Sequence, residues 1–307
     1  MTEISVGAAI GSGFGLITRK PLTVLAWGAL QVGPLLLLIP VYIAFISSVL
    51  PRLADAGSQP TQAQMTQMMG TMFAAQGGIF LGAMVAMLAR TMVWTASWRA
   101  VLQPERHAWG YLRLGKPELF IILLLFAAGF AANLVMLPLV PFIAIVVMLL
   151  VARQWIAAIV VGVLALVAMI AVIVYLELRF VLLGPMIVDD GEFRFVEAWR
   201  LSKGRVGSLF LIGLGLVGVG LGVEVLGLAL GAAVWAIILA TSGFGFDHLQ
   251  GFIQQPPATL IAEVVPYAIG SMVLSIPIVG ALSAIFMAPW ARAYRDLVPA
   301  PTGQTFA

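Results

Sequence analysis

The sequence predicts an all-α fold, a polytopic bundle of about six transmembrane helices, and two observations predict it. Of the 307 residues, 62% are hydrophobic and only 9% are charged. Apolar runs of roughly 20 to 35 residues recur along the chain, and about 20 apolar residues are enough for a helix to cross the hydrocarbon core of a bilayer. Because backbone groups find no water there, each run is expected to be helical.

The first three spans are separated by polar stretches. The first span is predicted at residues 22–50, and a stretch rich in Gln, Thr and Met follows at 51–76. The second span is predicted at 77–102. The third begins after Lys116-Pro117 and continues to about residue 151. Pro138 and Pro141 are expected to kink this run or to break it in two, which leaves open a re-entrant piece or a seventh span.

The remaining apolar runs complete the predicted bundle. Residues 152–155 (Ala-Arg-Gln-Trp) predict a tight turn with an interfacial tryptophan. The fourth, fifth and sixth spans are predicted at 156–183, 208–240 and 262–290. No segment has the mixed composition of a soluble domain, so residues 1–307 are expected to form one integral membrane domain. The first run is longer than the hydrophobic part of a signal peptide, about 7–15 residues, and is expected to stay as an anchor.

The composition excludes several kinds of chemistry. The chain has no cysteine, which excludes disulfides, thiolate catalysis and cysteine-bound metals. Its two histidines, His107 and His248, are too few for a zinc site built from histidine alone. No basic face is interleaved with aromatic residues, so no nucleic-acid partner is expected. No cofactor is expected either.

The distribution of Lys and Arg predicts the orientation. Thirteen of the sixteen cations flank the spans on one side, whereas only Arg52 and Arg153 flank them on the other. Positively charged loops stay in the cytoplasm. We therefore expect a multi-pass membrane protein with both termini in the cytoplasm.

The segments on the predicted cytoplasmic side resemble one another. An aromatic residue precedes a basic residue and then an apolar run at Phe14, Trp109 and Trp199, roughly every 90 residues. Arg99, Arg179 and Arg292 each end an even-numbered span, with a proline five to seven residues later. This pattern indicates three same-sense helical hairpins, at about 1–104, 105–190 and 191–299. The alternative is that shared positive flanks alone create the likeness.

Short amphipathic helices are expected to lie in the membrane interface before two of the spans. Val6, Ile10, Phe14 and Ile17 fall on one face of the first. Phe195, Ala198, Trp199 and Ser202 fall on one face of the second. Such helices anchor a cytoplasmic rim or sense anionic lipid. We call the candidate residues there the rim, which comprises Arg99, Arg179, Arg292, Asp189, Asp190, Trp109 and Trp199.

One block of the sequence resembles a known family. It runs Tyr175-Leu-Glu-Leu-Arg179-Phe-Val-Leu-Leu-Gly-Pro185-Met-Ile-Val-Asp189-Asp and continues as Glu197-Ala-Trp-Arg-Leu-Ser202-Lys-Gly204. This block resembles the recurring segment of the glycerophosphoryl diester phosphodiesterase membrane-domain family and of YciC-like bacterial inner-membrane proteins. The resemblance implies an integral inner-membrane protein. It does not imply phosphodiesterase activity, because nothing here matches the soluble catalytic barrel of those enzymes.

A few polar residues fall inside the predicted spans. Arg90 lies nine residues before Arg99, about 13 Å into the second span. Glu224 lies deep in the fifth span, and Asn133 lies at a similar depth in the third. These side chains pair to fix helix packing, or form a substrate or proton site. A third interpretation is that the long aliphatic side chain of Arg90 lets its guanidinium reach the cytoplasmic interface.

Two further clusters have more than one interpretation. Asp189, Asp190 and Glu192 could hold a divalent cation, but are more typical of a solvated loop or a helix N-terminus. Glycines crowd the fifth span, which predicts close helix approach in the bundle or at an oligomer contact. They are Gly213, Gly215, Gly218, Gly220, Gly222 and Gly227.

Three classes of function remain open. We favour a non-enzymatic protein that binds membrane lipid, anionic lipid included, or a membrane-protein partner or second copy. A transporter or channel for a small or lipid-like solute would use Arg90, Glu224 and Asn133. An intramembrane enzyme acting on lipid would use the acidic residues Asp189, Asp190 and Glu192, but the sequence shows no convincing nucleophile beside them.

Overall fold

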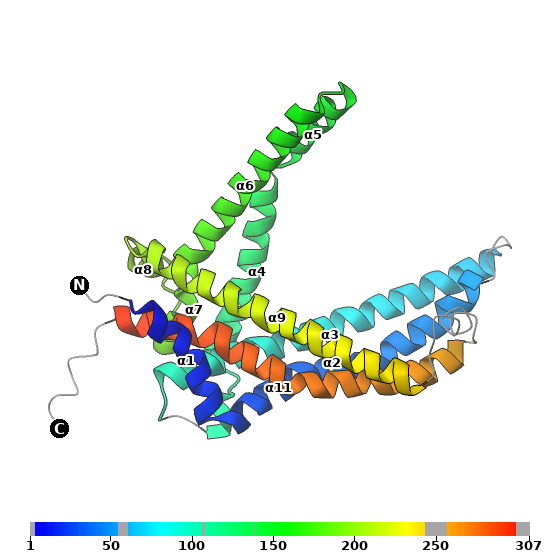
Figure 1. The fold of residues 1–307 in the computed structure, drawn as a ribbon, viewed down its shortest axis with the longest axis horizontal. Coiled ribbons are helices and arrows are strands. Elements are labelled where there is room, and N and C mark those ends of the chain that lie inside the picture. Colours follow the sequence, from blue (N-terminus) through cyan, green and yellow to red (C-terminus); the bar gives the residue numbers. More distant parts are fainter. Residues whose placement is uncertain (1–3, 55–60, 106–107, 138, 243–256, 299–307) are drawn as a thin grey trace. The chain divides into compact units, whose positions relative to one another are not determined.

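The chain is all-α throughout the residues that the structure describes (Figure 1). The structure is a computed structural model, and it describes residues 4–54, 61–105, 108–137, 139–242 and 257–298. Within these ranges, six helices are long and apolar enough to cross a membrane, which confirms the predicted fold class and the count of six. The candidate spans are Pro21–Phe45, Met65–Leu102, Trp109–Ala131, Trp155–Asp190, Val206–Ala233 and Val265–Leu297.

The first hairpin follows a short N-terminal helix. Helix α1 (Val6–Arg19) buries Ala9, Gly13 and Leu16, whereas Phe14 remains 44% exposed. The predicted face through Val6, Ile10, Phe14 and Ile17 therefore lies beside the face that packs on protein. Small residues form the packed face because they let the helix approach its neighbour closely.

Helices α2 (Pro21–Ala54) and α3 (Gln62–Leu102) form the first hairpin. The prediction that residues 51–76 form a polar gap is wrong for 62–76, which are helical and continue into the second span. Gln, Met and Ala favour helices, and the segment contains no proline, so polarity alone does not end the helix there.

The long third run is broken in two. Helix α4 (Lys116–Met136) ends two residues before Pro138, which lies outside the described residues, and α5 (Leu139–Val151) follows. Helix α5 alone rises only about 20 Å, too little to cross a bilayer by itself. It packs beside α6 (Trp155–Phe180) after a tight turn at Arg153, as the sequence predicts.

Two short helices connect α6 to the last hairpin. Helix α7 (Leu183–Asp190) ends at Gly191, whose φ of 71° is left-handed. Helix α8 (Phe195–Ser202) follows, and Ala198 and Ser202 on its predicted face are fully buried. Gly204 has a φ of 79°, which turns the chain into the next span.

Helices α9 (Val206–Ser242) and α11 (Pro257–Leu297) form the last hairpin. Of the predicted glycines on α9, Gly213 and Gly220 face Trp290 and Phe286 of α11, whereas Gly218, Gly222 and Gly227 face open space. Close approach to a neighbouring helix therefore applies to one side of α9. Both histidines, His107 and His248, lie outside the described residues.

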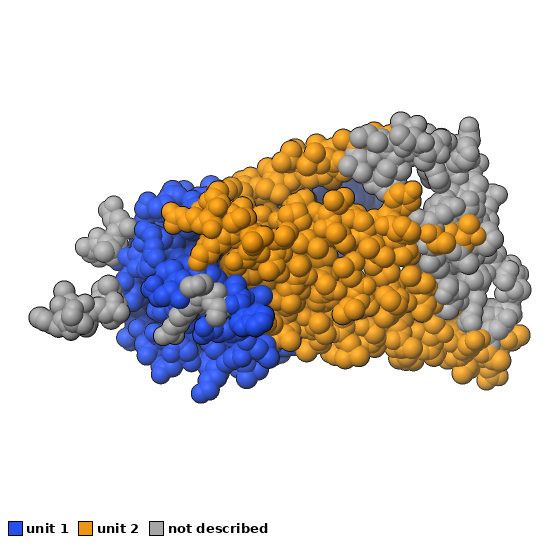
Figure 2. Space-filling view, turned by 90° about the horizontal axis from the view of Figure 1, so that it is seen from below, with its two compact units in different colours: residues 1–12, 95–214, 287–307 blue, residues 13–94, 215–286 orange. Residues whose placement is uncertain are grey.

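The described chain forms two compact units (Figure 2). Unit 1 comprises residues 1–12, 95–214 and 287–307, and it contains α4 to α8 with one end each of α1, α3, α9 and α11. Unit 2 comprises residues 13–94 and 215–286, and it contains most of the first and last hairpins.

Unit 2 is built on backbone contact between α2 and α11. A Cβ atom at Gly28 would overlap the carbonyl oxygen of Ile276, and one at Gly280 would overlap that of Val24. Three residues along α2, Gln31 donates a hydrogen bond of 2.8 Å to Ser283 of α11. Only glycine lets two helices pack at this separation.

Candidate functional site

A buried ion pair in unit 1 joins the end of α3 to the start of α4. Arg99 and Glu118 are 6% and 1% exposed, and their side chains form a salt bridge. Glu118 stands in the first turn of α4, behind Gly115 and Pro117, where a carboxylate is favoured by the helix dipole. The local sequence therefore places the acid where the arginine at the end of the preceding span can reach it.

Every strong acceptor of this pair is satisfied. One carboxylate oxygen of Glu118 accepts hydrogen bonds from Arg99 and, at 2.7 Å, from the hydroxyl of Thr95. Its other oxygen accepts the N–H of Gly115 at 2.9 Å. Arg99 also donates to the carbonyl oxygen of Tyr111 at 3.2 Å. Such complete bonding is what makes a buried charge pair tolerable.

We call this contact between the end of α3 and the start of α4 the Arg99 joint. Its aromatic residue is Tyr111, whereas the sequence suggested Trp109. Trp109 is 90% exposed, but Tyr111 is fully buried and its hydroxyl donates to the carbonyl oxygen of Pro104 at 2.9 Å. Both residues lie in the 3₁₀ segment η1 (Ala108–Tyr111), whose backbone is left-handed at Trp109, Gly110 and Tyr111. Spacing from the next basic residue does not predict this backbone conformation.

Arg179 forms a different joint, between α6 and α8. It is 6% exposed, donates to the hydroxyl of Ser202 at 3.3 Å, and lies with its guanidinium carbon 3.9 Å from the ring centroid of Trp199. Ser202 in turn donates to the carbonyl oxygen of Arg179. Thus an arginine, a tryptophan and a serine from the block that resembles the family meet in space. Among the described residues no carboxylate forms a salt bridge with Arg179, and its Nε is buried without a partner.

The third arginine of the pattern, Arg292, is not equivalent to the other two. Its side chain is 34% exposed and lies 3.1 Å from Asp296, one turn along the same helix. Arg295 instead makes the connection to another element, by donating to the carbonyl oxygen of Val101 at the end of α3.

The acidic cluster after α7 surrounds an arginine. Asp190, Glu192 and Glu197 each lie within 3.4 Å of the Arg194 guanidinium. The hydrogen bond to Glu192 and the neighbouring carboxylate charges raise the pKa of Arg194 above its ordinary value. Asp189 accepts a hydrogen bond from Tyr294 of α11 at 3.4 Å. Within the described residues, no three His, Cys, Asp or Glu side chains come together as a metal site.

An aromatic chain runs through this part of unit 1. Neighbouring ring centroids lie 4.4 to 6.3 Å apart along it. The rings come from α4, α6, α8 and the turn before α8, so the chain fixes α8 against two spans. In order they belong to Phe120, Phe193, Phe195, Phe180, Trp199 and Tyr175.

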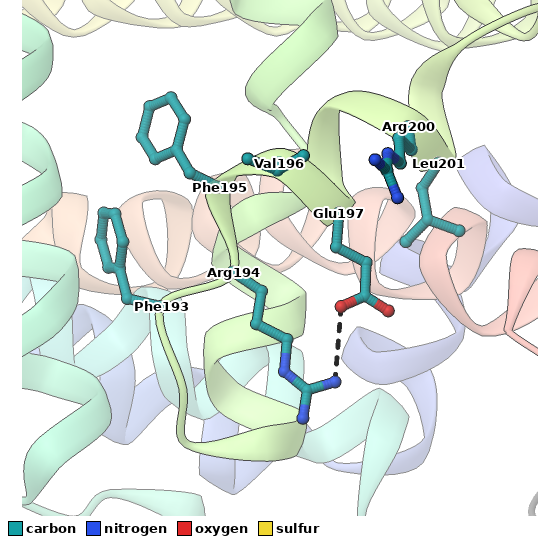
Figure 3. Close-up of a pocket in the computed structure, with 7 residues that line it drawn as sticks. All are labelled: Phe193, Arg194, Phe195, Val196, Glu197, Arg200 and Leu201. Atoms are coloured by element: carbon teal, nitrogen blue, oxygen red, sulfur yellow. Dashed lines mark hydrogen bonds and ion pairs between the residues drawn. The ribbon is translucent and has the colours of Figure 1, made fainter.

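The outer side of α8 carries an open groove of about 770 Å³. Phe193, Phe195 and Val196 line its apolar part, and Arg200 and Leu201 line the other end (Figure 3). Figure 3 shows Arg194 directed toward Glu197, away from the two phenylalanine rings. The groove therefore combines an apolar surface with a cation, an arrangement that suits an amphiphile better than a polar metabolite.

The predicted intramembrane residues are divided between the two units. In unit 2, Arg90 on α3 is exposed and stacks over Trp94 at 5.4 Å, and Glu224 on α9 is exposed. No ion pair links these two side chains in the described part of unit 2. In unit 1, Asn133 is exposed and donates to the carbonyl oxygen of Gly129, one turn back in α4.

The joints above were partly visible in the sequence, since the arginines at the span ends were predicted. Glu118, Thr95 and Tyr111 were missed. An acid in the first turn of a membrane helix, directly after a basic loop, is the signal that could have identified Glu118. The chain matches no protein-family model, no curated protein and no solved structure.

Proposed function

We propose that this protein is a non-enzymatic, multi-pass protein of the bacterial inner membrane that binds anionic membrane lipid along α8. The observation that carries the proposal is the groove on α8, which joins exposed aromatic side chains to an exposed arginine. Helix α8 lies between the candidate spans that end at Asp190 and begin at Val206. A helix in that position meets lipid headgroups and the upper acyl chains.

Two exposed cations at the end of α8 provide the positive charge that an anionic ligand needs. Asp190, Glu192 and Glu197 are engaged by Arg194. Arg200 and Lys203 are exposed, and within the described chain neither forms a salt bridge. A phosphate headgroup supplies the counter-charge that these two cations lack. Each Lys or Arg near an anionic surface contributes about 1 kcal/mol.

The exposed apolar residues favour a lipid over a soluble anion. Phe193, Phe195 and Val196 are 39%, 42% and 66% exposed beside the cations. In water these surfaces would be left uncovered, whereas acyl chains would cover them. Phe193 and Phe195 themselves belong to the aromatic chain that holds α8 in place, so the groove is preformed.

Orientation is part of the same proposal. The rim residues, the groove and both termini lie on the cytoplasmic side, as the bias of Lys and Arg indicates. Kinship with the glycerophosphoryl diester phosphodiesterase membrane-domain and YciC-like proteins is also proposed. It is supported by the roles of Arg179, Ser202 and Gly204 in fixing α8, since these residues belong to the block that carries the resemblance.

The transporter alternative has less support. A solute pathway would bring Arg90, Glu224 and Asn133 to its lining. Arg90 and Glu224 instead lie on the exposed surface of unit 2, and Asn133 bonds its own helix. A membrane-protein partner remains the other candidate ligand class for the rim.

The lipid proposal is tested by measuring lipid retention. Purified protein in mild detergent is titrated with phosphatidylglycerol or with phosphatidylcholine of the same chains, and bound lipid is counted by native mass spectrometry. We expect tighter binding of phosphatidylglycerol. The double variant Arg200→Gln, Lys203→Gln removes about 2 kcal/mol, equivalent to a loss of about 30-fold in affinity.

The matched control is Arg113→Gln, which removes an exposed cation outside the groove. It should leave phosphatidylglycerol binding within about twofold. Equal binding of the two lipids, or equal loss in the control and the double variant, would refute a specific site on α8. Retention of a second polypeptide without lipid would favour the protein-partner interpretation.

A further inference from the structure

Half of the methionines of this chain lie on one helix. Of the fourteen methionines, seven belong to α3, and four of these fall within eight residues as Met65-Thr-Gln-Met68-Met69-Gly-Thr-Met72. All four side chains are exposed, at 49%, 38%, 49% and 41% respectively. We call these four residues the methionine stripe.

The helix places the four thioethers on one face. Residues three, four and seven apart lie on the same side of an α-helix, with neighbouring Cβ atoms about 5–6 Å apart. Met65 and Met72, the ends of the stripe, are separated by about 10 Å along the axis. Met68 and Met69 lie between them. Methionine has three rotatable side-chain bonds, so sulfur atoms from this face can converge on a point above its centre.

The stripe lies at the far end of α3 from Arg99. Twenty-seven residues separate Met72 from Arg99, which corresponds to about 40 Å of helix. The hydrocarbon core of a bilayer is only about 30 Å thick. The candidate span Met65–Leu102 has 38 residues, more than a bilayer requires, so the stripe at its N-terminal end lies at or beyond a membrane surface, where an aqueous ion can reach it.

We propose that Met65, Met68, Met69 and Met72 form a thioether site for one soft monovalent metal ion of the Cu(I) class. Thioether sulfur is a soft, uncharged ligand that suits Cu(I), whereas Mg²⁺ and Ca²⁺ prefer carboxylate, carbonyl and water oxygens. Three of the four sulfurs suffice to surround such an ion, and the fourth can replace one of them as a ligand. The site is independent of lipid binding at α8.

The apolar alternative explains the stripe less well. Leu, Ile or Val would cover a hydrophobic partner equally, yet the exposed face between residues 62 and 72 contains only methionine among large apolar residues. Glutamine and threonine fill the remaining polar positions. A surface evolved for burial alone has no reason to use sulfur at every large apolar position of three turns.

Silver is the probe for the test, because Ag(I) has the same charge and softness as Cu(I) and does not oxidise in air. The full-length protein in detergent is titrated with silver nitrate in chloride-free buffer by isothermal titration calorimetry. We expect one Ag(I) per chain. The quadruple variant Met65→Leu, Met68→Leu, Met69→Leu, Met72→Leu should bind at least tenfold more weakly. Leucine conserves volume and helix propensity, so α3 is retained.

The control variant is Met84→Leu, Met148→Leu, which removes two exposed methionines outside the stripe, one on α3 and one on α5. It should bind Ag(I) as the unchanged protein does. Wild-type binding no tighter than that of the quadruple variant overturns the proposal. So does binding lost equally in the control.

Two further readouts hold even if the quadruple variant does not fold. Ag(I) should slow hydrogen peroxide oxidation of the stripe methionines in the unchanged protein, as mapped by peptide mass spectrometry, but not oxidation of Met148, which is 71% exposed. Binding should also be constant from pH 5.5 to 8, because a thioether carries no proton to lose. Protection of Met148 alone, or affinity that falls as histidine is protonated near pH 6.5, overturns the site.

Discussion

At the scale of single residues, the molecule treats two buried arginines in opposite ways. Arg99 is neutralised by Glu118, whose oxygens also accept from Thr95 and Gly115. Arg179 is bonded to a hydroxyl and covered by the face of Trp199. A charge pair fixes position by direction and distance, whereas a ring face tolerates sliding. The joint at Arg99 is therefore the more rigid of the two.

The Arg99 joint gives a residue-scale prediction. Glu118→Gln leaves the arginine buried without its counter-charge, which costs about 3–5 kcal/mol. We expect a large fall in the unfolding midpoint, measured by circular dichroism of the purified protein in detergent. Replacing both partners by apolar residues, Arg99→Met with Glu118→Leu, should recover much of this loss.

The control is Glu192→Gln, which removes a carboxylate whose side chain is 64% exposed. Exposed pairs contribute only about 0–1 kcal/mol, so the midpoint should barely move. A Glu118→Gln protein as stable as this control would show that the buried pair does not hold the joint.

The sequence located the arginines of these joints but not their partners. Arg99 and Arg179 were predicted because positive charge at a span end is a statistical rule of membranes. Glu118 was missed because that rule ignores acids. Tyr111 was missed because its burial depends on a left-handed backbone at Trp109 and Gly110, which neighbouring residues do not encode by periodicity.

At the scale of helices, length and packing depart from the pattern of hydrophobicity. Helix α3 begins at Gln62, well before its apolar part, since Gln and Met are good helix formers. The crowded glycines of α9 suggested its close contacts, but the tightest backbone approach uses Gly28 and Gly280. A lone glycine in an apolar run carries no signal of what it faces. The sequence alone therefore does not identify the helix that such a glycine contacts.

The α2–α11 contact gives an element-scale prediction. Gly28→Ala places a methyl group against the backbone of Ile276, which cannot yield as a side chain end can. Separating the helices also breaks the bond between Gln31 and Ser283. We expect a loss of about 1–3 kcal/mol or more, measured as the unfolding midpoint and as the amount of protein in the membrane.

Gly33→Ala is the matched change on the same helix, because nothing lies within 4 Å of the added atom. It should be neutral or slightly stabilising, since alanine favours helix over glycine. If both variants lost stability to the same extent, the α2–α11 contact would not be the cause.

At the scale of the whole molecule, the fold class was the part best predicted from the sequence. Six spans follow from apolar run length, and the structure has six suitable helices in its described ranges. The division into two units crosses four helices, and no sequence feature marks it. The identity of a ligand could not be predicted from the sequence, because a binding site is built from side chains of separate segments.

The absence of cysteine makes the orientation directly measurable. Single cysteines introduced at exposed positions give unique labels. Gln62→Cys and Gln154→Cys should react with a membrane-impermeant maleimide in intact cells. Ser5→Cys and Lys203→Cys should react only after the membrane is opened. The reverse pattern would place the α8 groove outside the cell and refute the proposed cytoplasmic site.

The glycine contact between α2 and α11 also has a consequence for how the protein is made. Gln31 and Ser283, which bond across this contact, are 252 residues apart. At about 5–20 residues per second, the ribosome needs roughly 10–50 s to reach the second after making the first. Throughout that time α2 stays in the membrane without α11, so its surface around Gly28 has no packing partner. A chaperone or an insertase that shields this surface would therefore determine how much newly synthesised protein escapes proteolysis.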